Sequence, residues 1–513
     1  MMSGFFSGRG SIFPACSAGM GVPGSCSREV QYNLFRKYYY FKEGIHMDYR
    51  KEYEKKCVPA EKAVADIRSG DVVDYGFFNG KPVVCDLALA GRHEELRDVS
   101  IFTAVTVPPV PEVIKYPESF SYMDWQWSKL TRIMHSQVEQ AYYSPILYHR
   151  APYFYRSLVD HYNTTKGYRS VYYKDEAKSK DVKWISIVRV APMDDAGFFN
   201  LGPHNSETSA SIDAADIVIL EVVKRMPVCR GGNEEAVHIS RVDYIVEAPD
   251  DHGCYDAPQM PPSDIDKKVA EHIMKEISDG CCIQLGIGGM PNMVGQLIAQ
   301  SDLKDLGGHT EMFVDAYVDM IESGKMNGSR KNIDRFKTSY TFAIGSQRMY
   351  DFMHNNPGLA SYPVDYTNDP KVICKIDNMI SICNAIQVDI FSQVNAESHG
   401  GGQISGNGGM WDFVLGAQWS EGGKSIICLP ATYPDSNGEI KSRIVASFAP
   451  STAVTIPRQM TDIIVTEFGA VKLQACPTWM RAEKIISIAH PDFRDELIKD
   501  AEKMKIWRKS NKK

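Results

Sequence analysis

The sequence predicts an α/β fold made of two duplicated open α/β domains. Two observations lead to this prediction. Short apolar runs, such as residues 217–220 (IVIL) and 463–465 (IIV), alternate with helical stretches along the chain, which is typical of buried, mostly parallel strands. One unit of helix, strand and glycine turn also occurs twice, and a repeat of this kind indicates a duplication.

The composition is that of a globular protein. The chain has 513 residues, of which 43% are hydrophobic, and a formal net charge of −7 with a pI near 6.0. This length predicts more than one domain, and the acidic balance disfavours binding to nucleic acid. No apolar run approaches the roughly 18–20 residues that span a bilayer. We therefore expect neither a nucleic-acid partner nor a membrane partner.

The first 46 residues differ from the rest of the chain. They are rich in Gly, Ser, Cys and aromatic residues and contain no acidic residue before Glu29. Residues 42–47 can be encoded by a purine-rich ribosome-binding sequence followed by a start codon, so we expect translation to begin at Met47 and residues 1–46 to be an extension outside the fold. A transit peptide is one alternative, and a disordered N-terminus is another. A charged helix is expected from Asp48 onward.

The first copy of the repeated unit spans residues 60–102. A helix from Ala60 is followed by an apolar strand at 71–75, a glycine turn at 76–80 and a second helix that ends near Leu96. Apolar residues at helical spacing and a short run rich in Val are the signals for these elements.

The second copy spans residues 265–313. It has a helix, a strand at 281–285, a glycine turn that begins at Gly286 and a helix that ends near Leu303. Gly76 and Gly286 take the same place in the two units, 210 positions apart. This spacing predicts that both halves of the chain have the same architecture.

A proline-rich stretch separates the two copies. Residues 247–262 show no apolar period and end before Ser263, a residue type that caps helix N-termini. We therefore expect an N-terminal domain at 47–262, which ends in this linker, and a C-terminal domain at 263–513.

The twelve cysteines are scattered, and none forms a C-x-x-C pair. This spacing predicts no zinc site and no other metal site. Cys428 lies in an apolar run, where cysteine packs as a small hydrophobic residue. We expect a reducing compartment, the cytoplasm.

Two glycine-rich segments in the C-terminal half are candidate binding loops. Residues 286–291 (GIGGMP) follow a strand and open a helix, where backbone N–H groups can approach an anion or a carbonyl oxygen. Glu311 lies at a distance in sequence that a dinucleotide fold would also allow, but Pro291 stands where that fingerprint needs glycine or alanine. A dinucleotide fold does not predict the second glycine loop, at 400–409. A plain tight turn remains the alternative for either loop.

Several motifs resemble those of the family I CoA-transferases, in the branch of acetyl-CoA hydrolase/transferase-like enzymes. They are GIGGMPN at 286–292, HTEM at 309–312, GKMNG at 324–328, PVDYTND at 363–369, QVNAES at 393–398 and ISGNGG at 404–409, with further matches at 191–194, 197–202 and 238–243. The resemblance runs from about Met47 to the C-terminus. It implies two open α/β domains of the NagB/Rossmann-like type and a CoA-transferase activity.

The resemblance also implies that the carboxylate of Glu311 is the nucleophile. It attacks the carbonyl carbon of an acyl-CoA, and ping-pong transfer proceeds through an acyl-glutamyl anhydride and a glutamyl-CoA thioester. The residues that the resemblance assigns to CoA and substrate binding are Gly286, Ile287, Gly288, Gly289, Met290, Ile386, Gly406, Gly408 and Gly409. Ile386 is expected to end a strand at 384–386 and to flank the reacting centre. Glycine suits such loops because a Cβ would keep the backbone away from the ligand.

The partners that the resemblance implies are a short-chain acyl-CoA and a short-chain carboxylate, with butyryl-CoA or propionyl-CoA as CoA donor and acetate as acceptor. Coenzyme A is then a substrate, and no tightly bound cofactor is expected. We also expect a homo-oligomer. The alternatives are a 4-hydroxybutyrate or succinate CoA-transferase, an acetyl-CoA hydrolase and, from other classes, an NAD-binding dehydrogenase or a non-catalytic binding module.

Four further features have two interpretations each. Glu397 either orients the site or caps a turn, and His309 either tunes the nucleophile or packs and forms hydrogen bonds. Lys424 either contacts a CoA phosphate or is a solvated residue at the start of a strand. The aromatic residues within 116–155 either line an acyl or CoA channel or belong to the core or to a subunit contact.

Overall fold

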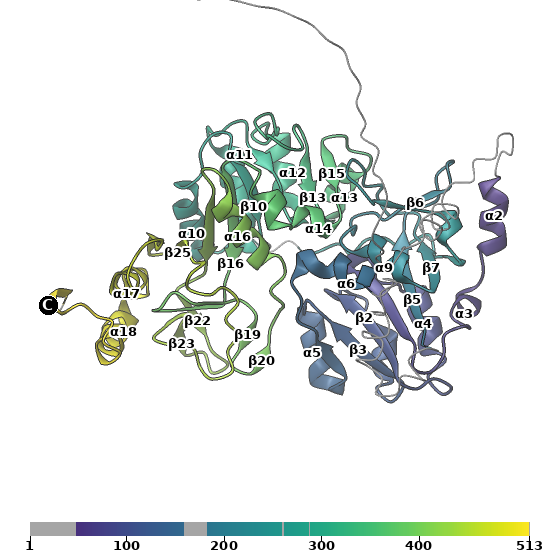
Figure 1. Cartoon of the computed structure of the whole chain (residues 1–513), viewed down its shortest axis with the longest axis horizontal. Coiled ribbons are helices and arrows are strands. Elements are labelled where there is room, and N and C mark those ends of the chain that lie inside the picture. Colours follow the sequence, from purple (N-terminus) through teal and green to yellow (C-terminus); the bar gives the residue numbers. More distant parts are fainter. Residues whose placement is uncertain (1–47, 158–181, 259–260, 287, 512–513) are drawn as a thin grey trace, which may run out of the picture. The chain divides into compact units, whose positions relative to one another are not determined.

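Residues 49–513 form one compact unit. The computed structural model describes residues 48–157, 182–258, 261–286 and 288–511 (Figure 1). The extension expected at 1–46 lies outside the described residues. Helices and strands alternate through most of the described chain, as the sequence predicts.

The first sheet has seven strands, and every neighbouring pair is parallel. In order across the sheet they are β4 (Ala141–Tyr143), β3 (Phe120–Asp124), β2 (Val99–Ala104), β1 (Val72–Phe77), β5 (Trp184–Val190), β7 (Ile217–Val222) and β9 (Tyr244–Glu247). The interior strands β1, β5 and β7 are buried along their whole length. Their runs of Val and Ile predict this burial, because a parallel strand is covered on both faces.

The second sheet has six strands. In order they are β11 (Gly307–Gly308), β10 (Cys282–Leu285), β16 (Met379–Asn384), β21 (Lys424–Cys428), β25 (Ile463–Thr466) and β26 (Gly469–Lys472), and only the last pair is antiparallel among them. Two further parallel strands are β13 (Thr338–Tyr340) and β15 (Leu359–Ser361). A parallel bridge between His309 and Ser339 connects them to the segment that follows β11.

The two sheets repeat one arrangement, which confirms the predicted fold class. Val72 of β1 lies between Ser100 of β2 and Trp184 of β5. Cys282 of β10, 210 positions later, lies in the same way between strands β11 and β16. The order β4, β3, β2, β1, β5, β7, β9 therefore corresponds to β15, β13, β11, β10, β16, β21, β25.

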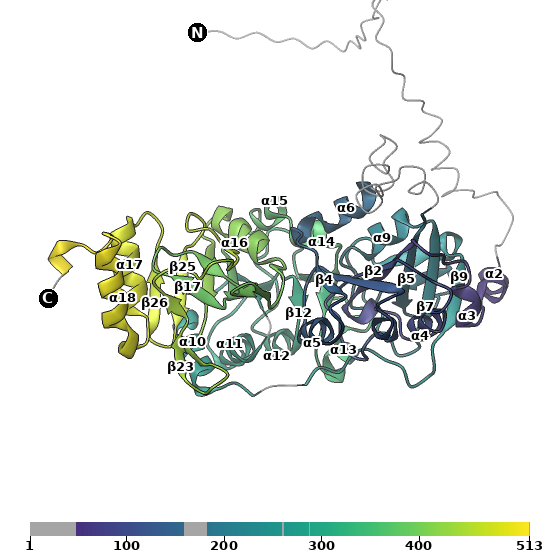
Figure 2. The ribbon, with the colours of Figure 1, turned by 90° about the horizontal axis from the view of Figure 1, so that it is seen from below.

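Helices pack against the two sheets. They are α2 (Tyr49–Lys56), α3 (Ala60–Ala63), α4 (Val84–Ala90), α5 (Lys129–Val138), α6 (Ala151–Ser157), α9 (Thr208–Ala214), α10 (Asp264–Met274), α11 (Gly289–Gln300), α12 (Asp315–Glu322), α13 (Gln347–Met353), α14 (Val364–Thr367), α15 (Pro370–Ile373), α16 (Met410–Trp419), α17 (Thr478–Ser487) and α18 (Pro491–Lys503). α10, α11 and α12 lie side by side, and α17 packs against α18 near the C-terminus (Figure 2).

Short elements complete the described chain. The strands are β6 (Phe198–Asn200), β8 (Ala236–His238), β12 (Met312–Phe313), β14 (Phe342–Ala343), β17 (Gln387–Asp389), β18 (Val394–Asn395), β19 (Ser398–His399), β20 (Gly402–Gln403), β22 (Thr432–Pro434), β23 (Ile440–Ser442) and β24 (Ile444–Val445). The 3₁₀ turns are η1 (Phe78–Gly80), η2 (Glu112–Lys115), η3 (Tyr148–Arg150), η4 (Ile239–Arg241) and η5 (Lys509–Asn511). β12 and β14 pair in parallel directly after the bridge at His309.

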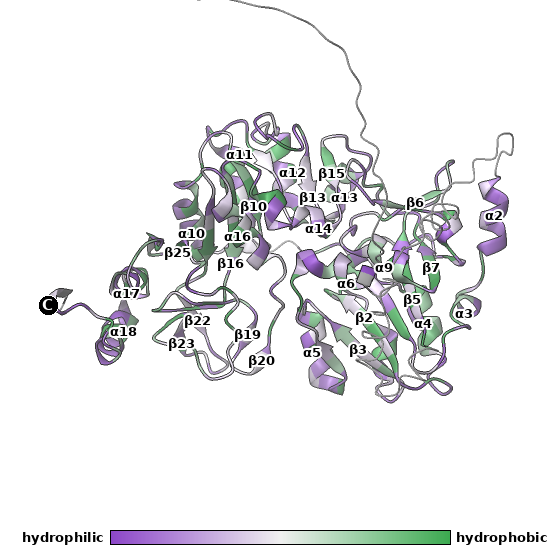
Figure 3. Ribbon diagram, viewed as in Figure 1, coloured by the Kyte–Doolittle hydropathy of each residue, from purple (hydrophilic) through white to green (hydrophobic). Residues whose placement is uncertain are grey.

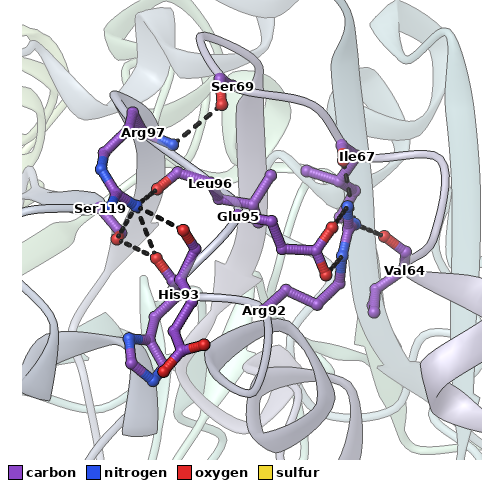
Figure 4. Close-up of polar contacts among 10 residues, drawn as sticks. Val64, Ile67, Ser69, Arg92, His93, Glu95, Leu96, Arg97 and Ser119 are labelled. Atoms are coloured by element: carbon purple, nitrogen blue, oxygen red, sulfur yellow. Dashed lines mark hydrogen bonds and ion pairs between the residues drawn. The ribbon is translucent and has the colours of Figure 1, made fainter.

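The predicted helix end near Leu96 is wrong. α4 ends at Ala90, and turns follow it. Arg92 explains the difference, because its guanidinium donates hydrogen bonds to the backbone carbonyl oxygens of Val64 and Ile67, the latter at 2.9 Å (Figure 4). These bonds draw the segment after α4 toward a different part of the chain and so end the helix early.

Arg97 anchors the same segment a second time (Figure 4). Its guanidinium donates to the carbonyl oxygens of His93 at 2.8 Å and Leu96 at 2.6 Å, and its backbone N–H donates to Ser69 Oγ at 2.9 Å. Side-chain donors thus satisfy carbonyl groups that a longer helix would satisfy internally. The helix predicted from Ala60 is short as well, since α3 has only four residues.

α10 begins where the sequence predicts. The Oγ of Ser263 accepts a hydrogen bond from the N–H of Asp266 at 3.1 Å, and the Asp266 carboxylate accepts one from the N–H of Ser263 at 2.8 Å. This capping box satisfies two backbone donors at the start of the helix. The described residues between β9 and α10 contain neither helix nor strand.

The largest apolar core cluster runs through both halves of the chain. It includes Phe77 and Phe102 from the first half and Leu285, Phe313 and Phe342 from the second. The ring centroids of Phe77 and Phe342 lie 4.7 Å apart. The strands of both sheets are predominantly hydrophobic, whereas α2 and α18 carry many hydrophilic residues (Figure 3). The two sheets therefore share one core rather than having wholly separate ones.

Candidate active site

An apolar cavity of about 640 Å³ lies where the carboxyl ends of strands from both sheets meet. The first half lines it with residues at the ends of β1, β2 and β3, and the second half with residues that follow β10, β11 and β20. Lining residues include Phe77, Val105, Trp125, Gly286, Glu311 and Gly408. Ligands of open α/β sheets bind outside the carboxyl ends of the strands, so this cavity is the candidate active site.

Glu311 lies at the wall of this cavity. It stands between the bridge at His309 and strand β12, and its backbone carbonyl accepts hydrogen bonds from the N–H groups of Thr341 at 3.0 Å and Phe342 at 3.3 Å. Its side chain is half-buried. The matching registers of the two sheets put Ala104 at the corresponding place in the first half, so the carboxylate belongs to one half alone.

Two donors bind the carboxylate of Glu311. Nδ2 of Asn368 donates to Oε2 at 2.7 Å, and the N–H of Gly409 donates to the same group. Burial raises the pKa of Glu311 to about 7, and the negative charge of Asp412 adds to the rise, while the two hydrogen bonds oppose it. The group is therefore partly ionised at neutral pH and more basic than an exposed glutamate, which suits a nucleophile.

Gln126 of the first half joins the second glycine loop to the cavity wall. Its side-chain oxygen accepts a hydrogen bond from the N–H of Gly408 at 2.9 Å, and its amide donates to Ser405 Oγ at 3.0 Å. A Cβ on Gly409 would lie 1.9 Å from Oε2 of Glu311. Glycine is therefore required for the loop to come this close to the carboxylate.

Two of the three predicted residues of the second glycine loop lie beside Glu311, and the third lies against Gln126. Gly408 lines the cavity, Gly409 donates to the carboxylate, and Gly406 packs against Gln126, where a Cβ would lie 2.3 Å from Oε1 of that residue. Gly408 also has a φ of +49°, a conformation that favours glycine.

The first glycine loop is placed as the sequence predicts, at the end of β10. Gly286 lines the cavity, Gly288 is the N-cap of α11 with a φ of +118°, and Gly289 and Met290 are the first two residues of that helix. The last three lie beyond the cavity lining. Ile287 lies outside the described residues.

The prediction that Ile386 ends a strand is wrong. β16 ends at Asn384, and Ile386 lies in the short connection to β17. Its N–H donates to the carbonyl of Asn395 at 2.8 Å, and its own carbonyl accepts from the guanidinium of Arg443 at 3.0 Å. Ile386 therefore has a structural position beyond the cavity lining.

The first half also has a glycine turn before a helix, but there a carboxylate of the protein occupies the N-terminus of the helix. Glu221 accepts hydrogen bonds from the N–H groups of Val83, Val84 and Cys85 at the start of α4, at 2.9–3.1 Å. Arg189 lies 3.7 Å from the same carboxylate. The backbone donors at the start of α4 are thus bound by a carboxylate of the protein itself.

The second half has neutral residues at the same two places. Arg189 pairs with Glu221 in the register of β5 and β7, and Asn384 pairs with Cys428 in the register of β16 and β21. The Sγ of Cys428 lies 4.0 Å from Sδ of Met290, in the first turn of α11. A small thiol therefore replaces the carboxylate at this place, while the carboxylate of Asp266 lies near Gly289, the first residue of α11.

Three of the sequence candidates have structural roles. Glu397 accepts a hydrogen bond from Thr455 Oγ1 at 2.8 Å and supports the second glycine loop from behind. His309 donates to a backbone carbonyl at 2.8 Å, and burial lowers its pKa to about 4, so it is neutral at pH 7. Lys424 forms an ion pair with Glu276 at 2.9 Å.

The aromatic residues within 116–155 fit both interpretations, because some of them line the cavity and others belong to the core. Trp125, Trp127 and Tyr148 line the cavity. Phe120 and Tyr122 belong to an apolar core cluster of the first half. Tyr142 and Tyr153 are exposed.

Sequence reasoning missed four polar residues around Glu311. They are Gln126, His149, Asn368 and Asp412. Asn368 lies inside the motif at 363–369, so the family resemblance could have drawn attention to it. The other three carry no sequence signal, because their role depends on the meeting of distant segments.

Within the described ranges, no group of three or more His, Cys, Asp or Glu side chains could bind a metal ion. No helix in that part of the chain is long and apolar enough to cross a membrane.

Two family models match the chain. The acetyl-CoA hydrolase/transferase N-terminal domain matches residues 42–252, and the acetyl-CoA hydrolase/transferase C-terminal domain matches residues 345–501. The chain belongs to the acetyl-CoA hydrolase/transferase family. The first model covers the segments that contain Gln126 and His149, and the second covers both the second glycine loop and Asn368.

Named members of this family are similar to the chain over most of its length. It is 44% identical to the butyryl-CoA:acetate CoA-transferase of Anaerostipes caccae over 91% of this chain and 100% of that protein. It is 33% identical to the 4-hydroxybutyrate coenzyme A transferase of Clostridium kluyveri over 89% and 100%. The crystal structure of RipA from Yersinia pestis has a TM-score of 0.78 at 33% identity, over 90% and 100%. These matches confirm the predicted family and the prediction of a CoA-transferase enzyme.

Proposed function

We propose that the protein transfers CoA from butyryl-CoA, or a similar short-chain acyl-CoA, to acetate through covalent intermediates on Glu311. The observation that carries this proposal is the Glu311 carboxylate, with a pKa raised to about 7, at the wall of an apolar cavity built by both halves. The name of the relative from Anaerostipes caccae supports the choice of donor and acceptor.

The first half-reaction has two steps. Oε1 of Glu311 attacks the carbonyl carbon of the acyl-CoA, the C–S bond breaks, and CoA leaves as a thiolate while an acyl-glutamyl anhydride remains. The thiolate then attacks the carbonyl carbon of Glu311, which releases the acyl group as a carboxylate and leaves a glutamyl-CoA thioester. This is covalent catalysis, in which each intermediate keeps the activation of the starting thioester.

The second half-reaction reverses these steps with acetate. Acetate attacks the glutamyl-CoA thioester, and the CoA thiolate that leaves then attacks the acetyl carbon of the mixed anhydride, giving acetyl-CoA and free Glu311. Each attack produces an oxyanion that fixed N–H donors stabilise. In this proposal the thioester carbonyl lies against the first glycine loop, which begins at Gly286 at the cavity wall, because the N–H groups of Gly408 and Gly409 already bind Gln126 and Glu311.

The cavity suits the substrates in two respects. Its walls are mostly apolar, as an alkyl chain requires, and Lys129 and Arg132 contribute positive charge at one side. Positive charge attracts both a carboxylate and the phosphates of CoA. Coenzyme A enters and leaves as a substrate, so the proposal needs no resident cofactor.

The full-length protein tests the reaction directly. With butyryl-CoA and saturating acetate, we expect acetyl-CoA to form in excess over free CoA, because a mostly apolar cavity favours acetate over water as the attacking group. Mainly free CoA from the wild-type protein would instead identify a hydrolase.

The covalent step has its own test. Incubation with butyryl-CoA alone, borohydride reduction and peptide mass mapping should find the modification on Glu311, and a modification on Glu397 would contradict the assignment. Glu311→Asp shortens the side chain by one methylene, about 1.5 Å, and a misplacement of about 1 Å can lower a rate about a hundredfold. We therefore expect this variant to fold normally and to lose most of its transfer activity.

A further inference from the structure

A chain of three polar side chains lies behind Glu311, on the side of Oε2. Nδ2 of Asn368 donates to Oε2 at 2.7 Å, and the Asn368 side chain also forms a hydrogen bond with Asp412. Asp412 is fully buried in the first turn of α16. His149 binds it twice, through Nδ1 at 2.7 Å and through its backbone N–H at 3.2 Å.

We propose that His149, Asp412 and Asn368 are positioning residues, which bind Oε2 of Glu311 and so present Oε1 to the carbonyl carbon of the substrate. The proposal rests on the proposed function of Glu311 as nucleophile. None of the three residues needs to touch the substrate for this role.

The orientation of the Asn368 amide supports this positioning role. Its nitrogen faces two carboxylates, those of Glu311 and Asp412, and its oxygen has no hydrogen-bond partner within the described part of the chain. The reverse orientation would place an amide oxygen against two carboxylates, which repel it. Asp412 therefore determines which way the amide points, and the amide determines where Oε2 lies.

The position of Oε1 of Glu311 also supports this role. Gly408 lines the cavity, and a Cβ on it would lie 3.4 Å from Oε1, whereas a Cβ on Gly409 would meet Oε2. Oε1 is thus on the side of the cavity and Oε2 on the side of Asn368. A carboxylate with one oxygen bound and the other directed at the cavity loses less freedom when it attacks, which lowers the barrier.

The place of His149 in the first half of the chain supports this role as well. It belongs to η3 of the first half, and its neighbour Tyr148 lines the cavity on the same turn. Its ring also stacks over Trp411, with centroids 6.5 Å apart. The chain of hydrogen bonds therefore connects the nucleophile in the second half to the cavity wall in the first half, so the geometry of both changes together.

Three other titratable groups lie in this region, Tyr148, Cys383 and Glu207, and burial disfavours the charged form of each. Burial raises the pKa of Tyr148 well above its usual value, and the charges of Glu207, Glu311 and Asp412 raise it further. Burial also raises the pKa of Cys383 to about 12 and that of Glu207 to about 8. Asp412 is thus the charged group whose removal should change the titration of Glu311 most.

The experiment compares His149→Ala, His149→Asn, Asp412→Asn and wild type, with His272→Asn as a control on α10, where the ring lies beside Lys275. Asn at position 149 can place Nδ2 near the position of Nδ1 and so donate to Asp412. We expect His149→Ala and Asp412→Asn to lower kcat roughly ten- to a hundredfold, as misplacement of a reacting group does, with little change in KM. His149→Asn should recover most of kcat, and the control should match wild type.

The pH profile of kcat/KM separates positioning from general damage. Asp412→Asn removes a negative charge beside Glu311 and so moves the acid limb to lower pH. His149→Asn keeps a donor to Asp412 and should leave the limb where wild type has it. An unshifted limb in Asp412→Asn, or a shifted limb in His149→Asn, would overturn the proposal. Asp412→Asn and His149→Asn conserve size and keep the test valid if His149→Ala unfolds.

The covalent adduct distinguishes this proposal from the proposed function. If wild type forms no adduct on Glu311, the proposed function is wrong. If wild type forms the adduct and the variants form it at the wild-type rate, Glu311 is the nucleophile but the three residues do not position it. The expected result is an adduct at Glu311 in all proteins, formed more slowly in His149→Ala and Asp412→Asn.

Discussion

The raised pKa of Glu311 lowers the stability of the folded protein. Its pKa is about 7 in the folded protein, against an ordinary value of 4.5. As the pH rises between these values, the unfolded chain releases the proton before the folded protein does, so the free energy of unfolding falls. The destabilisation is complete above the folded pKa and disappears below the unfolded one.

We therefore expect Glu311→Gln to unfold at a higher temperature than wild type near pH 8, because the variant has no charge to bury. The difference should shrink toward pH 5. Thermal unfolding followed by circular dichroism at both pH values measures it, with Glu271→Gln on the exposed side of α10 as control. A variant less stable than wild type at pH 8 would contradict the raised pKa.

Residues that act within one short motif could be predicted, and residues that act across the fold could not. Glu311 lies in the HTEM motif, and the glycines lie in two contiguous loops, so local sequence carries their signal. Gln126, His149 and Asp412 are single polar residues in ordinary surroundings. Their role comes from contacts across more than 250 positions of sequence, which no local pattern records.

The second glycine loop and the start of α16 together support the side chain of Glu311. Gly409 is the N-cap of α16 and has a φ of −89°, which any residue can adopt. A Cβ there would nevertheless meet Oε2 of Glu311 at 1.9 Å and Nδ2 of Asn368 at 2.2 Å. The clash would fall on the flexible end of a side chain, which can move away without unfolding the helix.

Gly409→Ala should therefore fold with nearly the wild-type unfolding temperature and lose most transfer activity, because Glu311 must leave its hydrogen bond with Asn368. Gly401→Ala is the matched control in the same loop, since its Cβ would have only an ordinary contact with Ser451 at 3.9 Å. Initial rates of acetyl-CoA formation and thermal unfolding test both variants. Full activity in Gly409→Ala would show that Oε2 need not stay where it is.

Strands and glycine turns could be predicted more accurately than helix ends. Buried Val and Ile runs leave no alternative to a covered parallel strand, and the predicted strand at 281–285 differs from β10 by one residue. The end of α4 depends instead on Arg92, which binds carbonyl groups of a different segment. The strand predicted to reach Ile386 ends at Asn384 instead, because the chain turns there toward β17.

The two halves have the same architecture but different residues at equivalent places. The first half has Glu221 where the second has Cys428, and Ala104 where the second has Glu311. Glu221→Gln should leave the buried Arg189 without its counter-charge and lower the free energy of unfolding by about 3–5 kcal/mol. kcat and KM of the protein that remains folded should be unchanged.

Urea unfolding and steady-state kinetics measure these two effects separately. Asp250→Asn is the control, because its ion pair with Lys224 is exposed and exposed pairs contribute about 1 kcal/mol or less. Loss of activity in Glu221→Gln below the unfolding transition would show that the first half takes part in the chemistry through this residue.

The duplication itself could be predicted, from two glycines 210 positions apart. The division of roles could not, because it depends on which residues the strand registers put at equivalent places. Sequence spacing shows that Gly76 and Gly286 correspond. Only the paired strands show that Glu221 and Cys428 do.

The shared apolar core bears on how the protein denatures. Phe77 packs against Phe342 across the two halves, so separating the halves would expose aromatic surface on both, at roughly 25 cal/mol for each Å². We therefore expect the two sheets to unfold at nearly the same temperature. Partial opening of the cavity is disfavoured for the same reason. Catalytic competence should consequently persist on heating until the whole unit unfolds in one cooperative transition.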